Sequence, residues 1–330
     1  MINLLFLEYE TAMHRVDPSI HIMASSVGQP TWVHSLLKAL PVPLLATSIY
    51  TGAYENGTDT KIRNYEEFYR KVVAEPLEFD RKLEENIRAA GNLLPRERPF
   101  FAITEFDSWW LSETVDPDYR LPNALYFAGV FHSLLRHTQE VLKAEVSTTL
   151  NVQGIVEINP VAIKLTPPYF AYLLYSNHLG NSVLATRTEG PMTSFNDQLP
   201  ALDAMATMKQ DRGKLYLTVI NRNEKRDISA TIRIRGWTPT PGSPAQVFLL
   251  NGKDKVAANS YGSPTEVNIQ ETTAHVEEST FSYQYPAHSI TVLEIAGRCR
   301  IKKSFVLVQR GGQGRRLAET FGIFSPRERV

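Results

Sequence analysis

The first half of this 330-residue chain alternates between two hydrophobic patterns. Segments with apolar residues every three or four positions predict helices, and short continuous apolar runs between them predict buried parallel strands. The predicted helices cover residues 4–15, 31–39, 65–90, 122–136 and 169–175. The predicted strands cover residues 20–24, 44–50, 100–104 and 150–158. This order of elements predicts a parallel sheet with right-handed crossovers.

Two residues are expected to shape the helix over 65–90. Pro76 should split or kink it, because proline removes a backbone donor inside a helix. Gly91 is well placed to end it in a left-handed C′ conformation.

The pattern changes after about residue 196 to short β-rich runs separated by turn signals such as Pro241-Gly242 and Asn251-Gly252. The predicted strands here cover residues 215–221, 228–234, 245–250 and 289–295. They predict an antiparallel all-β domain, a sandwich, that ends at Ala296. We therefore expect an α/β domain over 1–195, a β-sandwich over 196–296, and a basic tail over 297–330 outside the fold.

Composition and charge exclude several classes of function. Lys plus Arg equals Asp plus Glu, 35 each, so nothing points to nucleic acid or an acidic membrane as a partner. The tail carries nine Lys or Arg against two Glu, a run that is usually solvated and only sometimes a nucleic-acid arm. The single Cys299 excludes an internal disulfide. No signal peptide or membrane span is visible, which favours a cytoplasmic location.

The stretch from Phe100 to Trp110 holds the candidate chemistry. Glu105 follows an apolar run, and α/β enzymes place reactive groups at the carboxyl ends of such strands. Glu105 could instead cap the next helix or pair with a basic residue. Trp109 and Trp110 could stack on a sugar ring or simply pack in the core. We interpret Asp107 as a capping or supporting residue rather than a second catalytic carboxylate.

Several segments resemble the α-L-arabinofuranosidases of glycoside hydrolase family 51. The segment Thr104–Trp110 resembles that family's nucleophile segment, and Asn123–Gly129 resembles the helix that follows it. Further segments that resemble the family, in the same order, are 14–20, 150–156, 166–169, 176–180 and 286–294. The resemblance extends over roughly residues 8 to 296.

This resemblance implies a fold and an activity. The fold would be the C-terminal half of a (β/α)8 TIM barrel, strands five to eight within 1–195, followed by the β-sandwich. Glu105 would be the nucleophile of a retaining glycosidase, which uses two carboxyl groups. The substrates would be arabinan or arabinoxylan oligosaccharides losing terminal α-L-arabinofuranosyl groups. The resemblance implies no metal and no organic cofactor, and His14, His21 and His34 lack ligand spacing. It also implies a homo-oligomer, although a fragment need not keep that interface.

The chain also departs from the family pattern. The family's acid/base Glu precedes the helix with which this sequence begins, so we expect that group to be absent from this chain. Ser48-Ile49-Tyr50 lacks the histidine of the corresponding family segment. Tyr50 is then either a substrate-binding residue or a packed core tyrosine. These departures keep open a second function, that of a catalytically inactive remnant or carbohydrate-binding module of the same family.

Overall fold

The computed structural model describes residues 2–26, 30–39, 42, 44–52, 61–94, 99–110, 112–116, 119–152, 154–211, 213–299 and 305–310. These residues form two compact units. Unit 1 comprises Met1–Lys61, Glu75–Leu111 and His137–Ser147. Unit 2 comprises Ile62–Ala74, Ser112–Arg136 and Thr148–Val330. The boundary predicted at residue 195 therefore lies within unit 2.

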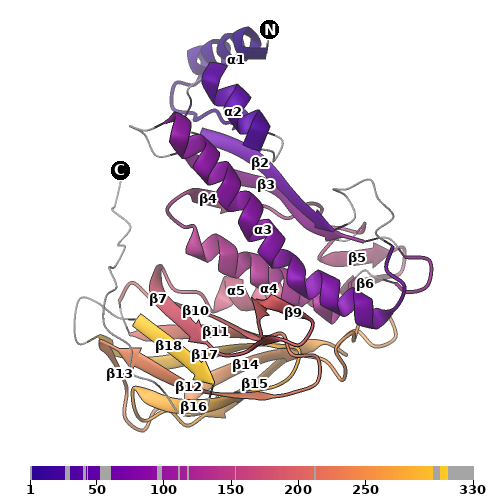
Figure 1. Ribbon diagram of the computed structural model, residues 1–330, viewed down its shortest axis with the longest axis vertical. Helices are drawn as coiled ribbons and strands as arrows, with labels where there is room; N and C mark the ends of the chain where they lie inside the picture. The colour runs from indigo at the N-terminus through magenta and orange to yellow at the C-terminus, as the bar shows by residue number, and fades with distance from the viewer. Residues whose placement is uncertain are drawn as a thin grey trace. The chain divides into compact units, whose positions relative to one another are not determined.

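Unit 1 contains a four-stranded parallel sheet in the order β1-β2-β3-β4. Figure 1 labels its strands β2, β3 and β4. The strands are β1 (Ala24–Ser25), β2 (Leu44–Gly52), β3 (Phe100–Trp109) and β4 (Val141–Ala144). The middle strands bury apolar side chains such as Leu45, Ile49 and Phe106. The predicted parallel sheet is confirmed.

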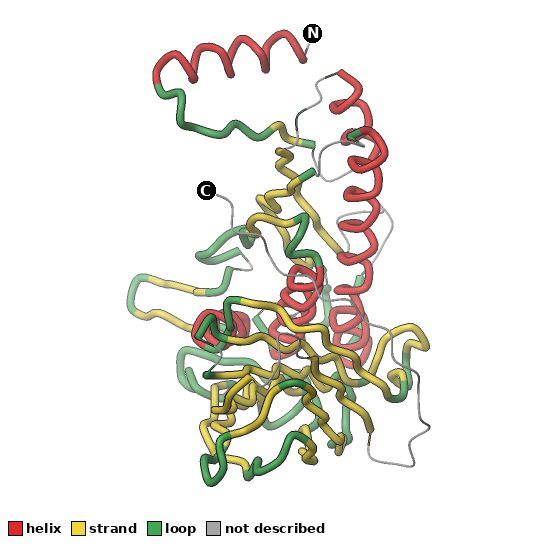
Figure 2. Tube along the Cα trace, turned by 90° about the vertical axis from the view of Figure 1, so that its left-hand side faces the viewer, coloured by secondary structure: helices red, strands yellow, loops and turns green. Residues whose placement is uncertain are grey.

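The helices of unit 1 are α1 (Ile2–Val16), α2 (Pro30–Ala39) and the part of α3 (Tyr65–Leu93) that begins at Glu75. This part of α3 runs alongside β2 and β3 (Figures 1 and 2), and the ring of Phe79 packs edge-on against Phe106. The helix continues through Pro76, which is buried, and past Gly91. The predicted end at Gly91 is wrong, since the helix continues to Leu93.

Unit 2 pairs two helices with a large sheet. The helices α4 (Leu121–Arg136) and α5 (Pro167–Asn177) pack against each other through aromatic rings. The ring centroids of Phe131 and Tyr175 lie 4.8 Å apart. The sheet has the order β15-β14-β17-β11-β10-β7-β18-β12-β16, with β13 paired to β17. Its strands are β7 (Ser182–Glu189), β10 (Leu202–Met208), β11 (Lys214–Asn221), β12 (Ile228–Arg235), β13 (Trp237–Pro239), β14 (Ala245–Asn251), β15 (Asn268–Ala274), β16 (Thr280–Tyr285), β17 (Ser289–Cys299) and β18 (Phe305–Arg310).

The sheet of unit 2 folds into a sandwich around one apolar core. Its core brings together side chains from strands near both ends of the strand order, such as Val247 on β14 and Tyr285 on β16, with Leu217 of the central strand β11. The four strands predicted from sequence in this region are confirmed as β11, β12, β14 and β17. Two short hairpins accompany the sandwich, β5 (Val156–Asn159) with β6 (Ala162–Leu165) and β8 (Met192–Thr193) with β9 (Asn196–Pro200).

Two further expectations need correction. The fourth parallel strand is β4, whereas residues 150–158, predicted to be that strand, contribute only an antiparallel hairpin strand, β5. The chain beyond Ala296 was expected to lie outside the fold, but β17 extends to Cys299 and β18 pairs with both β12 and β7. Residues 300–304 and 311–330 of that tail, and the whole loop from 53 to 60, lie outside the described residues. None of the described helices is long and apolar enough to cross a membrane.

Candidate active site

A bulge sets the position of Glu105 on β3. Thr47 of β2 pairs with Ile103, but the next residue, Ser48, pairs with Glu105, so Thr104 is an extra residue without a partner on β2. The Thr104 hydroxyl donates a hydrogen bond to the Thr47 carbonyl oxygen at 3.3 Å. Bulges redirect the side chains that follow them and are frequent beside active sites. Glu105 emerges from this bulge with an exposed side chain, after a run of buried residues.

Alternation along the two strands sorts their side chains onto two faces. Phe106 packs against α3, so the residues on either side of it, Glu105 and Asp107, point to the opposite face. Tyr50, the partner of Asp107 in the register, shares that face. The sheet therefore presents Tyr50 and Glu105 together at the carboxyl ends of neighbouring parallel strands.

Tyr50 and Glu105 are in direct contact. The Tyr50 hydroxyl donates a hydrogen bond to Oε2 of Glu105 and lies 2.9 Å from Oγ of Ser147. Because one phenol has one proton, Ser147 completes the pair by donating its own. Burial, followed by the hydrogen bond to Glu105, raises the pKa of Tyr50 to about 12. Tyr50 is therefore a protonated donor at neutral pH, and sequence analysis gave no sign of Ser147.

Asp107 and Trp109 occupy the same strand face as Glu105. Asp107 is 6% exposed, and its Oδ1 accepts the backbone N–H of Ser108 at 2.7 Å, which agrees with a local capping role. Trp109 is 37% exposed, so part of its indole ring faces solvent.

Trp110 lies on the other face of the strand. Its indole N–H donates a hydrogen bond to Oε1 of Glu75 on α3, and the other carboxylate oxygen of Glu75 accepts the Thr51 hydroxyl at 2.5 Å. Trp110 thus points toward the helix rather than sharing a face with Glu105. Glu75 was missed from the sequence, although a carboxylate in register with the apolar positions Val72 and Phe79 was a signal that could have found it.

One group of described residues in unit 1 has ligand types suited to a cation. Asp80 and Glu84 of α3 and His137 place their ligand atoms within 4.8 Å of one another. Nε2 of His137 lies 3.2 Å from Oδ1 of Asp80, and Glu84 approaches Arg88, so ion pairs account for the arrangement. The expectation that the protein needs no metal stays a prediction.

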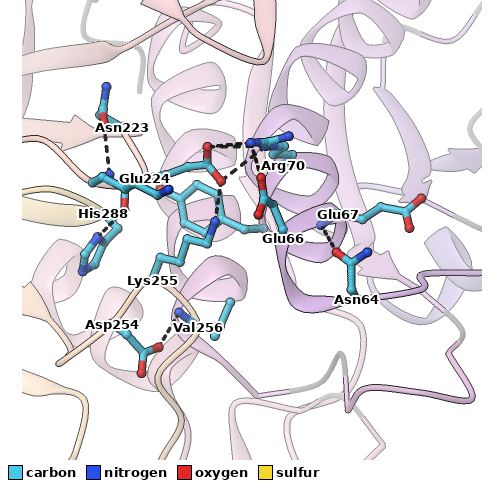
Figure 3. Close-up of polar contacts among 12 residues, drawn as sticks. Asn64, Glu66, Glu67, Arg70, Asn223, Glu224, Asp254, Lys255, Val256 and His288 are labelled. Carbon is cyan, nitrogen blue, oxygen red and sulfur yellow. Dashed lines mark hydrogen bonds and ion pairs between the residues drawn. The ribbon is translucent and has the colours of Figure 1, made fainter.

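Unit 2 contains a separate charged cluster around Glu224 (Figure 3). Glu224 is 8% exposed and accepts hydrogen bonds from Lys255 at 2.5 Å and from Arg70 at 3.2 Å. Burial raises the pKa of Glu224, but these two cations outweigh it and hold the pKa below its usual value. The carboxylate is fully engaged with its partners, which indicates that the cluster fastens the first turns of α3 to the sandwich.

These features define a class of protein. A parallel α/β sheet with an exposed carboxylate at a strand end, joined in the chain to an antiparallel sandwich, is typical of barrel-type glycoside hydrolases. The model of the alpha-L-arabinofuranosidase C-terminal domain matches residues 104–289, more than half of the sequence, and the chain belongs to that family. No curated protein matches the sequence.

Solved structures give the same fold. An arabinofuranosidase crystal structure superposes with a TM-score of 0.68 at 24% identity, over 87% of this chain and 60% of that one. The family 51 α-L-arabinofuranosidase of Thermotoga petrophila RKU-1 gives 0.67 at 22% identity, over 87% and 60%. The Thermotoga maritima enzyme in its arabinose complex gives 0.66 at 24%, over 88% and 60%.

The chain thus spans about 60% of the length of these structures. The fold is the C-terminal half of a (β/α)8 barrel followed by a C-terminal β-sandwich, as the sequence predicts.

Proposed function

We propose that this chain carries the nucleophile of a retaining α-L-arabinofuranosidase site and that Glu105 is that nucleophile. The observation that carries the proposal is the hydrogen bond from Tyr50 to Oε2 of Glu105 at the carboxyl end of the parallel sheet. Among the described residues, Oε1 of Glu105 has no hydrogen-bond partner. One oxygen of the carboxylate is held and the other is presented to a substrate.

The chemistry needs both of these properties. In a retaining glycosidase the carboxylate oxygen bonds to the anomeric carbon as the glycosidic bond breaks, and a second carboxyl group protonates the departing oxygen. Water then attacks the glycosyl ester and releases the carboxylate. Tyr50 supports the first step by orienting Glu105. Its pKa of about 12 keeps the phenol neutral, so it adds no negative charge beside the nucleophile.

We propose terminal α-L-arabinofuranosyl groups of arabinan or arabinoxylan oligosaccharides as the substrate class. The membership of the family supports this class, and the Thermotoga maritima relative is described in complex with arabinose. Trp109 adds a partly exposed indole on the strand face of Glu105, and aromatic faces of this kind stack on sugar rings.

The second candidate is a carbohydrate-binding module or catalytically inactive remnant of the same family. The burial of Asp107 favours this second candidate. Asp107 is the carboxylate nearest to Glu105 along β3, but it is buried and accepts a backbone N–H. We therefore assign the acid/base role to no described residue. Loss of a general acid costs about 10²–10⁴-fold with natural substrates.

An aryl α-L-arabinofuranoside with a good leaving group tests the proposal, because departure of an acidic phenol needs little protonation. We expect slow turnover by the wild-type chain, its loss in Glu105→Ala, and its partial recovery with azide as an arabinosyl azide of inverted configuration. Glu145→Gln is the matched control, since Glu145 is exposed and pairs with Lys143 at 2.7 Å.

Two results would reject the nucleophile assignment. One is unchanged turnover in Glu105→Ala, and the other is azide rescue that occurs equally in the Glu145→Gln control. No turnover by the wild-type chain, together with retained binding of arabino-oligosaccharides, would support the binding module instead.

A further inference from the structure

The face of α3 that lies against β2 and β3 carries polar residues among its apolar ones. Phe79 and Leu83 are fully buried there, but so are the side chain of Asn86 and nearly all of Glu75 and Lys82. A buried carboxylate is costly unless hydrogen bonds compensate it. The contacts of Glu75 and Lys82 therefore indicate what these residues do.

Glu75 joins the ends of two strands. Its Oε2 accepts the hydroxyl of Thr51 at 2.5 Å, and its Oε1 accepts the indole N–H of Trp110. Thr51 belongs to β2, and Trp110 directly follows β3. Each carboxylate oxygen thus holds a different strand end.

Neighbouring contacts fix the same short segment. Gly52 has a φ of +86°, and a Cβ at that position would clash with the carbonyl oxygen of Trp109 and lie 3.0 Å from Nε1 of Trp110. The Trp110 indole therefore lies directly against the Gly52 backbone. Tyr50 precedes Thr51 in β2, and its carbonyl oxygen accepts a hydrogen bond from the Lys82 ammonium at 2.9 Å.

The two residues that are hydrogen-bonded to Glu75, Thr51 and Trp110, lie on the face of the sheet toward α3. The residue before each of them in the chain, Tyr50 and Trp109 respectively, lies on the opposite face, which is the face of Glu105. We infer that Glu75 is a positioning residue that, through Thr51 and Trp110, fixes the strand ends presenting Tyr50 and Trp109 to the sugar. This inference rests on the proposed function for its effect on catalysis, but not for its effect on the two tryptophans.

The four tryptophans of the chain allow a direct test by ¹⁹F NMR of protein labelled with 5-fluorotryptophan. In Glu75→Met, which keeps the side-chain length but removes both acceptors, we expect the resonances of Trp110 and Trp109 to shift and broaden. Trp237, buried in unit 2, is the internal control and should not move. Glu75→Gln should retain the wild-type spectrum, because its amide oxygen can accept from Trp110 while its amide group donates to Thr51.

Activity supplies a second readout. A misplacement of about 1 Å can cost about 10²-fold in rate, so Glu75→Met should lower kcat on the aryl arabinofuranoside about 10- to 100-fold. Glu75→Gln should stay within about threefold of wild type on the same reasoning. Glu85→Met makes the same change at a partly exposed position of the same helix, where Glu85 pairs with Arg81, and should leave kcat unchanged.

Trp110→Phe removes the same hydrogen bond from its donor side, which keeps the inference testable if Glu75→Met does not fold. Trp110→Phe alone should shift the Trp109 resonance. Adding Glu75→Met to Trp110→Phe should change that resonance little further. Unmoved Trp109 and Trp110 resonances in folded Glu75→Met, or an unmoved Trp109 resonance in Trp110→Phe, would overturn the inference. If the wild-type chain has no turnover, the proposed function fails while the ¹⁹F spectra still decide the role of Glu75.

Discussion

Asp203 on β10 offers a demanding test of how unit 2 is held together. It is 6% exposed, and Arg222 donates to its Oδ2 at 2.7 Å while Arg136 donates to its Oδ1. Nδ1 of His132 lies 3.3 Å from Oδ2. One buried carboxylate therefore faces three basic side chains, two of them from α4.

Replacing Asp203 by Asn keeps the shape of the side chain but removes its charge. The Arg222 side chain is only 4% exposed, so its guanidinium would be left buried without a counter-charge. Breaking a buried ion pair from one side typically costs about 3–5 kcal/mol. Arg136 is 42% exposed, and water screens its pairing, so it adds at most about 1 kcal/mol. We expect a loss of about 3–5 kcal/mol in the free energy of unfolding of unit 2.

The effect should depend on pH with a definite sign. Burial raises the pKa of Asp203, but Arg222, His132 and Arg136 outweigh it and hold the pKa well below its usual value. A lowered pKa means that the stabilisation is fully present above the unfolded value of about 3.9. It is lost as the pH falls from there toward the folded value. The difference between wild type and Asp203→Asn should therefore shrink below about pH 4.

The free energy of unfolding of unit 2 is measured by urea unfolding followed by Trp237 fluorescence. The other three tryptophans are replaced by phenylalanine in every protein compared. Trp237 is 1% exposed in the core of unit 2 and reports on that unit. Asp197→Asn changes an exposed residue of unit 2 and should stay within about 0.5 kcal/mol of wild type. A cost of Asp203→Asn below about 1 kcal/mol, or a double-mutant coupling with Arg222 near zero, would refute the reasoning.

Three further changes have expected outcomes. Tyr50→Phe removes a hydrogen bond to a charged group, worth about 1.5–3 kcal/mol, so kcat/KM on an aryl arabinofuranoside should fall about 10- to 100-fold. Gly52→Ala should lower the free energy of unfolding more than Gly242→Ala. Both glycines have a positive φ, which costs an alanine about 1–2 kcal/mol, but only at Gly52 would the added Cβ also clash with backbone atoms. Equal losses in the two variants would contradict this. Glu224→Gln should destabilise unit 2 by about 2–4 kcal/mol in chemical denaturation. Because the pKa of Glu224 is lowered, that cost should be present above about pH 4.3 and diminish as the pH falls further.

The sequence predicted the elements whose pattern is local. Periodicity and apolar runs identified β2, β3, the five helices and four sandwich strands, and each of these except α1 buries one continuous face or run. Glu105 was found for the same reason, as the first exposed residue after an apolar run. The bulge at Thr104 has no such signal, since it depends on the register with β2.

The errors arose where tertiary pairing decides the structure. The apolar run over 150–158 looks like a strand, yet the shorter β4 pairs with β3. The hydrophobic residues of β18 were obscured by the basic composition around them, although β12 and β7 cover both of its edges. Trp109 and Trp110 were indistinguishable as candidates. Their assignment to opposite faces follows from strand alternation and from the hydrogen bond of Trp110 to Glu75, which lies 35 residues away in the chain.

The division of α3 between the two units has a consequence for synthesis on the ribosome. The chain passes from one unit to the other five times, once in the middle of a helix between Ala74 and Glu75. Unit 1 cannot close until its last segment, His137–Ser147, has emerged, and unit 2 needs both Ile62–Ala74 and the much later β18. Contacts between such distant segments slow folding. In most multidomain proteins the N-terminal domain folds before the next domain is synthesised. In this chain that order is not possible, because each unit contains a segment that is synthesised after part of the other unit.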